Sequence, residues 1–248
     1  MAGYERELAA AQLTLRRAGQ VSQMFCRNLG ALAPIMVPPF GAHFGRRPGM
    51  VASVLDHKYW FARLYELMTL YEIQERIRFS NPGFVMHFIP IFHDLYYNAL
   101  QAFLAGRTGG VSALWMRHFN GPDQGDNAAG IDALKFSVVT GVTAHIQGDM
   151  ATALEQAYRT YSADPKPPFN DFYKDFFSTN RPIFDIAKAQ FFLDVAQKAP
   201  FPFRPELSQF IMGTGDQLGA GGLDINEVYR WRDNAWNTAR TRLTVATP

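Results

Sequence analysis

A histidine and an aspartate lie four residues apart in a largely apolar stretch, residues 143–151 (TAHIQGDMA). If the stretch is helical, His145 and Asp149 project from the same face, so the carboxylate could orient the imidazole for proton transfer or share a metal ion with it. The alternative is structural: Asp149 would cap a helical segment after Gly148, while His145 makes a hydrogen bond in the core. Spacing alone favours neither interpretation.

Further candidate site residues lie on three other predicted helices. His93 and Tyr97 share a helical face and could bind a substrate, although an isolated histidine among aromatic residues is more often structural. Arg232 and Trp236 share a face of the last helix and could line a pocket, or could belong to a packed helix whose arginine extends to solvent. Asp171 follows a proline-rich loop and could supply a second carboxylate or simply complement a helix dipole.

Familiar catalytic and metal-binding motifs are missing from the sequence. It contains no HExxH, no paired Glu-x-x-His, no calcium-binding EF-hand loop and no G-x-S-x-G. The glycine-rich run at residues 213–222 lacks the strand and the Gly-Lys-Ser/Thr ending of a phosphate loop. A divalent metal would therefore need scattered ligands, for which His145, Asp149 and Asp171 have suitable donor atoms. The metal-free interpretation requires no cofactor.

The elements that must position these residues are predicted to be helices. Apolar residues recur at three- and four-residue spacing over residues 50–78, which predicts a long helix. Asn81 and Pro82 predict the start of a second helix, which runs to residue 104 with a kink at Pro90. Residues 131–145 are almost all apolar or small, which predicts a buried helix that continues to about residue 158.

Three more helices are expected in the same way. A short helix is predicted at residues 111–119, and a phenylalanine-rich helix at residues 170–197 that Pro182 should break or kink. The last helix is predicted at residues 224–243. Because no convincing β-strand and no internal repeat are present, we predict an all-α fold of about seven to nine helices.

The composition is that of a folded protein with a large core. Of the 248 residues, 48% are hydrophobic, 14% aromatic and 19% charged. No low-complexity linker divides the chain, so we expect a single helical domain over residues 1–248. In it, residues 1–49 would form amino-terminal helices and a proline-rich loop, and residues 50–248 the main helical body. The net charge of +2 gives no reason to expect a nucleic-acid partner.

Other features of the sequence bear on its cellular location. The amino terminus lacks the basic-then-apolar order of a secretory signal, which favours a cytoplasmic location. Pro34, Pro38 and Pro39 interrupt the longest uncharged run, so we predict no transmembrane segment. A single cysteine, Cys26, excludes an intramolecular disulfide and any multi-cysteine metal site.

Four motifs in a fixed order resemble those of an uncharacterised bacterial family, domain of unknown function 5995. They are an aromatic helix at residues 92–100 with a Tyr-x-x-Ala-Leu-like ending, A-H-I-x-x-D at residues 144–149, an aspartate-led helix start at residues 171–173, and R-D-x-A-W at residues 232–236. The similarity covers roughly residues 79–243. It implies that His145, Asp149 and Asp171 are site residues, and it implies no particular reaction.

The sequence also departs from the pattern of that family. Before His145 the resemblance leads one to expect asparagine, but this chain has Ala144. Before Asp149 it leads one to expect a larger side chain than that of Gly148, and His93 has no counterpart in the family pattern. These departures imply a specialised substrate or a changed activity, for example in specialised biosynthetic metabolism.

Three functional hypotheses follow from these residues. The first is a small-molecule enzyme, a lyase, cyclase or hydrolase, in which His145 and Asp149 act as an acid–base pair on a largely apolar substrate between aromatic helices. The second is a metal-dependent hydrolase that uses the same residues. The third is a non-catalytic binding protein, in which the segment from Pro34 to Phe40 docks on a protein partner or a second copy of the chain. The same segment could instead be a lid over the pocket.

Overall fold

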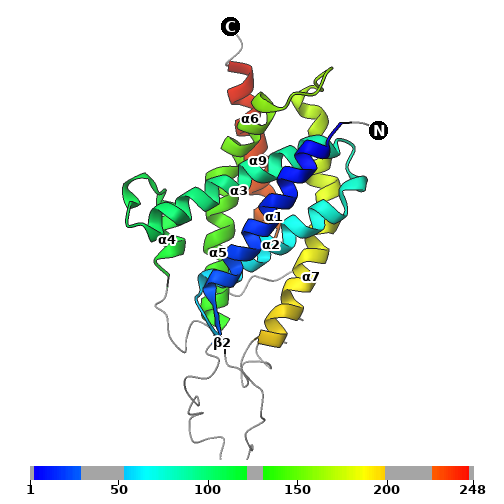
Figure 1. The fold of residues 1–248 in the computed structure, drawn as a ribbon. Coiled ribbons are helices and arrows are strands. Elements are labelled where there is room, and N and C mark those ends of the chain that lie inside the picture. The colour runs from blue at the N-terminus through cyan, green and yellow to red at the C-terminus, as the bar shows by residue number, and fades with distance from the viewer. Residues whose placement is uncertain (1–2, 29–52, 122–130, 199–224, 246–248) are drawn as a thin grey trace, which may run out of the picture.

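The computed structural model describes residues 3–28, 53–121, 131–198 and 225–245, and it confirms the predicted all-α fold (Figure 1). The α-helices are α1 (Glu5–Phe25), α2 (Lys58–Gln74), α3 (Pro82–Leu104), α4 (Ala113–Phe119), α5 (Ile131–Thr143), α6 (Met150–Thr160), α7 (Asn180–Lys198) and α9 (Ile225–Val245). If α5 and α6 are counted as one continuous helix, the described residues hold seven helices, within the predicted range. The proline-rich segment from Pro34 to Phe40 and the glycine-rich run at residues 213–222 lie outside the described residues.

Helix α2 is central to the packing. It contacts α1 along one side and α5 and α7 along others, while α3 packs against α1 and α6, and α9 packs against α6. Figure 1 shows α4 at one side of the bundle and α7 at the other. The aromatic rings of α2 and α3, among them Trp60, Phe61, Phe84 and Tyr96, are almost fully buried between these helices. The high aromatic content of the sequence is therefore used to fill the core.

The start of α2 corrects the prediction of a helix from residue 50. Ser53–Leu55 forms a short strand, β2, that pairs antiparallel with β1 (Cys26–Asn28). The helix begins only at Lys58, whose backbone N–H donates to Asp56 Oδ1 at 3.0 Å, so the Asp56 carboxylate caps the first turn. It ends at Gln74 and is followed by a 3₁₀ turn at Arg76–Arg78.

Helix α3 begins where Asn81 and Pro82 predict it, with Pro82 in the first turn. The Asn81 side chain makes no capping bond. Instead the buried carboxylate of Asp175 accepts the backbone N–H groups of Ser80 and Asn81, both at 2.7 Å. Pro90 lies inside the helix without ending it.

Two wide helical turns interrupt the regular α-helices. The first π-turn (Ala144–Asp149) joins α5 to α6, so the predicted helix does continue to Thr160. The second π-turn (Asp175–Thr179) precedes α7 and follows a 3₁₀ turn at Phe169–Phe172. Pro182 does not break the predicted helix, because α7 continues directly from the second π-turn and runs through Pro182 to Lys198.

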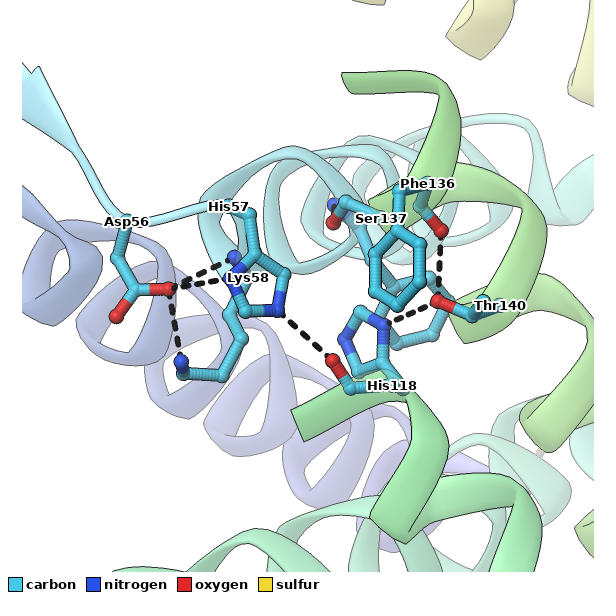
Figure 2. A network of polar contacts seen from close by, with 8 residues as sticks. Asp56, His57, Lys58, His118, Phe136, Ser137 and Thr140 are labelled. Carbon is cyan, nitrogen blue, oxygen red and sulfur yellow. Dashed lines mark hydrogen bonds and ion pairs between the residues drawn. The ribbon is translucent and has the colours of Figure 1, made fainter. Parts of the chain in front are cut away.

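A buried polar network ties the start of α2 to α4 and α5 (Figure 2). His57 Nε2 donates to the carbonyl of His118 at 2.8 Å, and the Thr140 hydroxyl donates to the carbonyl of Phe136 at 2.6 Å. Because the only proton of that hydroxyl is already donated to Phe136, the hydroxyl must accept a hydrogen bond from Nδ1–H of His118, which lies 2.9 Å away. His118 is thus held as the Nδ1–H tautomer, and burial lowers its pKa well below the ordinary value.

We expect Thr140→Val to lower the free energy of unfolding by about 1–3 kcal/mol, because it leaves the buried Nδ1–H of His118 without an acceptor. Urea unfolding would measure the loss. The matched control is Thr143→Val, because within the described residues the Thr143 hydroxyl bonds only to the carbonyl of Val139 in its own helix. If the two variants lose equal stability, the bond to His118 contributes nothing.

Candidate functional site

A cavity of about 100 Å³ lies between α2, α3, the α5–α6 helix, α7 and α9. Most of its wall is apolar, with large contributions from Phe61, Phe88, Phe92, Met150, Phe176 and Phe184. Its polar lining residues are Tyr65, Glu72, His145, Asn180, Tyr229 and Arg232. A mainly apolar cavity with a few converging polar groups is typical of a small-molecule site.

Both π-turns contribute to this cavity. His145 and Ile146 line it from the first π-turn, and Phe176 lines it from the second, with Asn180 in the next position after that turn. A π-turn inserts one extra residue into a helix and so changes the direction of its side chains, and such insertions occur frequently at functional sites.

His145 is enclosed by aromatic rings. Its imidazole stacks on Phe92 at a centroid distance of 3.5 Å and an interplanar angle of 11°. The ring of Tyr65 meets it edge-on at 5.0 Å, and that of Phe61 at 5.8 Å. The residue is only 4% exposed, and this burial lowers the pKa of His145 below its ordinary value, although Asp149 opposes the shift. At neutral pH the imidazole is therefore uncharged.

Asp149 lies beside the imidazole, as the four-residue spacing predicts. Its Oδ2 accepts a hydrogen bond from Trp115 Nε1 at 2.9 Å and lies 3.5 Å from His145 Nδ1. The longer distance exceeds that of a well-directed hydrogen bond, and among the described residues Nδ1 has no hydrogen-bond partner. Trp115 therefore fixes the carboxylate, and the carboxylate favours the tautomer that carries its proton on Nδ1. In that tautomer Nε2 holds the free electron pair, and among the described residues it has no hydrogen-bond partner.

Arg232 lines the same cavity from α9. It is 6% exposed, its Nη2 donates to the carbonyl of Phe176, and its guanidinium lies over the Phe177 ring at 5.7 Å. Burial lowers the pKa of Arg232, while Glu72 and Tyr229 oppose that shift. The prediction that Arg232 faces a pocket is in keeping with this position, and the structure brings it into the same cavity as His145.

Four polar residues of the cavity wall, Tyr65, Glu72, Asn180 and Tyr229, were not among the predicted site residues, and two of them bond to each other. Glu72 of α2 accepts a hydrogen bond at Oε1 from Asn180 Nδ2 at 2.5 Å. Burial raises the pKa of Glu72, whereas Asn180 and Arg232 oppose the rise. A signal for Glu72 was present, because it follows Tyr65 and Met68 at helical spacing and so shares the apolar face of α2. Asn180 carries no comparable local signal.

Other predicted site residues lie away from the cavity wall. Asp171 is exposed in the 3₁₀ turn before the second π-turn. Trp236 is buried, stacks on Phe169 at 4.2 Å and meets the cavity residue Phe176 at 5.7 Å, but it does not itself line the cavity. The structure therefore does not bring these two residues together with His145, and a role for them in the site stays a prediction.

His93 and Tyr97 form a stack next to the cavity rather than in its wall. Their rings are 5.7 Å apart, and the ring of Tyr65 also stacks with that of His93 at 5.4 Å. His93 is fully buried, and burial together with the nearby His145 lowers its pKa to about 3. Through Tyr65 this stack supports the ring that meets His145 edge-on.

The described part of the chain holds no cluster of metal-binding side chains: no group of three or more histidine, cysteine, aspartate or glutamate residues there is arranged to hold a metal ion. His145, Asp149 and Asp171, the ligands that the metal hypothesis requires, are thus not clustered. Among the described helices, none is both long and apolar enough to cross a membrane.

Sequence comparison identifies the family of the chain but no similar protein of known structure. No curated protein and no solved structure matches it. The model of a family of unknown function, DUF5995, matches residues 50–248. The match therefore begins before residue 79, where the motifs suggest that the similarity starts. The match spans all the helices that line the cavity. The chain therefore belongs to the DUF5995 family.

Proposed function

We propose that this protein is a small-molecule enzyme in which His145 exchanges a proton with a largely apolar substrate held in the cavity. The observation that carries the proposal is the state of the imidazole. It is almost fully buried, it lines an apolar cavity, and its Nε2 has no partner in the described part of the chain. A buried polar atom without a partner is uncommon and calls for a functional explanation.

The surroundings of His145 suit it to act as a general base. A neutral imidazole can accept a proton at Nε2, and Asp149 then stabilises the imidazolium through Nδ1. The aromatic walls lower the local dielectric constant, which strengthens that electrostatic interaction. Elimination, cyclisation and hydrolysis can all begin with such a proton transfer. We assign the second carboxylate of the site to Glu72, because it lines the cavity whereas Asp171 is exposed.

Incubation with a library of small apolar compounds in D₂O tests the proposal. Proton NMR would detect both chemical conversion and incorporation of solvent deuterium into a carbon position. We expect at least one compound to react, and the rate to fall by at least about 10²-fold in His145→Gln, which keeps the volume of the side chain but removes its basicity.

The matched control is His87→Gln, because His87 lies on α3 outside the cavity wall and bonds to Thr160 at 2.8 Å. It should react at the wild-type rate. Equal rates in the wild type and His145→Gln would refute a proton-transfer role for His145. If compounds bind in the cavity but none is changed, the protein is a binding protein instead.

A further inference from the structure

We infer that the part of the cavity around Arg232 binds the zwitterionic head group of a small α-amino acid with an apolar side chain. Arg232 would bind the carboxylate, and Glu72 with Asn180 would bind the ammonium group. Under the function proposed above, such an amino acid or a close derivative is the substrate on which His145 acts.

The first observation is the incomplete pairing of Arg232. A guanidinium has five N–H donors, and burying it without partners is costly. Within the described residues its one hydrogen bond is to the carbonyl of Phe176, its Nε has no partner, and none of the ion pairs includes it. A carboxylate binds a guanidinium through two parallel hydrogen bonds, so it is the group that best completes this site.

The second observation is a set of acceptors in the same wall. Asn180 is 3% exposed and donates to Glu72 Oε1, but its own Oδ1 has no partner in the described part of the chain. Glu72 and Asn180 therefore offer oxygen atoms to a donor that the described residues do not supply. An ammonium group has three N–H donors and no acceptor, which matches this side of the cavity.

The third observation is the charge balance. Glu72 and Arg232 line the same cavity, but none of the ion pairs among the described residues joins them. A ligand with only a carboxylate would place its negative charge near that of Glu72, and a ligand with only an ammonium would place its positive charge near Arg232. A zwitterion adds no net charge and gives each buried group an opposite partner.

The remaining wall and the volume define the side chain of the ligand. Phe88, Ile89, Phe184 and Val228 present only carbon to the cavity, so the side chain must be apolar. The volume of about 100 Å³ is several times the roughly 10–15 Å³ that one water molecule needs and is below the roughly 150 Å³ of a cavity known to hold benzene. A short branched side chain such as that of valine therefore provides the probe.

Isothermal titration of the full chain with three matched compounds tests the inference. Valine carries both charged groups, 3-methylbutanoate lacks the amine, and 2-methylpropylamine lacks the carboxylate, while all three share one branched carbon skeleton. We expect valine to bind at least about tenfold more tightly than either analogue. This comparison uses only the wild-type protein, so it does not depend on the folding of a variant.

Two substitutions then assign each charge to its residue. Arg232→Gln should weaken the binding of valine and of 3-methylbutanoate by at least about tenfold. Glu72→Gln should weaken the binding of valine but not that of 3-methylbutanoate, a selective effect that general destabilisation would not produce. The control is Arg230→Gln, which changes an exposed arginine of the same helix and should leave all affinities unchanged.

Some outcomes overturn the inference and leave the proposed function intact. If 3-methylbutanoate binds as tightly as valine, or if valine does not bind, the amino-acid class is wrong, while deuterium exchange that depends on His145 would still support the enzyme. Conversely, if valine binds through Arg232 and Glu72 but His145→Gln changes no reaction, the head-group site is correct and the proton-transfer function is wrong.

Discussion

Asp175→Ala is expected to lower the free energy of unfolding by about 3–5 kcal/mol. The carboxylate is fully buried and accepts the backbone N–H groups of Ser80 and Asn81 at 2.7 Å each. It also places a negative charge at the positive end of the α3 dipole, where Asn81 supplies no side-chain cap of its own. Alanine would leave both N–H groups without this acceptor and would separate the second π-turn from α3. Urea unfolding followed by circular dichroism would measure the loss.

The matched control is Asp171→Ala, four residues earlier in the same segment. Because the Asp171 side chain is exposed, we expect its removal to change the stability by no more than about 0.5 kcal/mol. If the two variants lose similar stability, the capping of α3 by Asp175 is not a major contribution. The same control protein tests the predicted site role of Asp171, because the removal of a catalytic carboxylate would lower the reaction rate without affecting the stability.

This contrast also shows a limit of inference from one sequence. Asp171 and Asp175 both occur near the start of a phenylalanine-rich segment, and the charge rule for helix starts favours the first of them. Asp175, however, follows Phe172 by three residues and precedes Phe176, so helical spacing places it near the buried aromatic face. The α3 terminus that it caps is distant in sequence. No local pattern could identify this partner.

The helices themselves were more predictable, because their signals are local. Pro82 marks the start of α3, and the apolar spacing of residues 131–158 indicates the continuous helix that carries His145. The start of α2 was placed too early, since pairing between β1 and β2 competes with helix formation there. That pairing joins residues more than twenty positions apart, which helical periodicity does not detect.

The candidate site was predictable only in part for the same reason. His145 and Arg232 could each be identified as candidates because a second candidate side chain follows four residues later, and the structure places both in the wall of one cavity. Glu72 and Asn180 come from α2 and α7, and their importance depends on meeting Arg232 of α9. The π-turn at His145 is also hidden in the sequence, because one additional residue in a turn leaves the apolar pattern almost unchanged.

Phe61→Ala is expected to lower the free energy of unfolding by about 3–5 kcal/mol, the usual cost of deleting a buried aromatic ring. Phe61 is 2% exposed, and it meets Tyr96, Trp115 and His145 at centroid distances of 5.3, 5.6 and 5.8 Å. The ring also packs against the backbone of Gly141. A Cβ atom at that position would lie only 2.3 Å from Phe61 Cγ.

This contact makes the two positions interdependent. Gly141→Ala alone should cost about 1–3 kcal/mol, because the added methyl group must displace the ring that packs against His145. In the Phe61→Ala protein the ring atoms that lie 2.3 and 2.4 Å from the added methyl group are gone, and among these close contacts only the Cβ atom of residue 61, at 2.8 Å, still has to shift. Gly141→Ala should therefore cost less there than in the wild type, with a coupling energy of about 0.5–3 kcal/mol.

Urea unfolding of the four proteins measures this coupling, with Gly148→Ala as the control. A Cβ atom at Gly148 would meet only Leu114 Cδ1 at an ordinary 3.5 Å, so that variant should not couple to Phe61. If Gly141→Ala costs the same with and without the Phe61 ring, the close packing of α5 on α2 does not hold the ring in place. The imidazole of His145 would then depend for its position on its stack with Phe92 and on Asp149, whereas strong coupling makes Gly141 part of what fixes that ring.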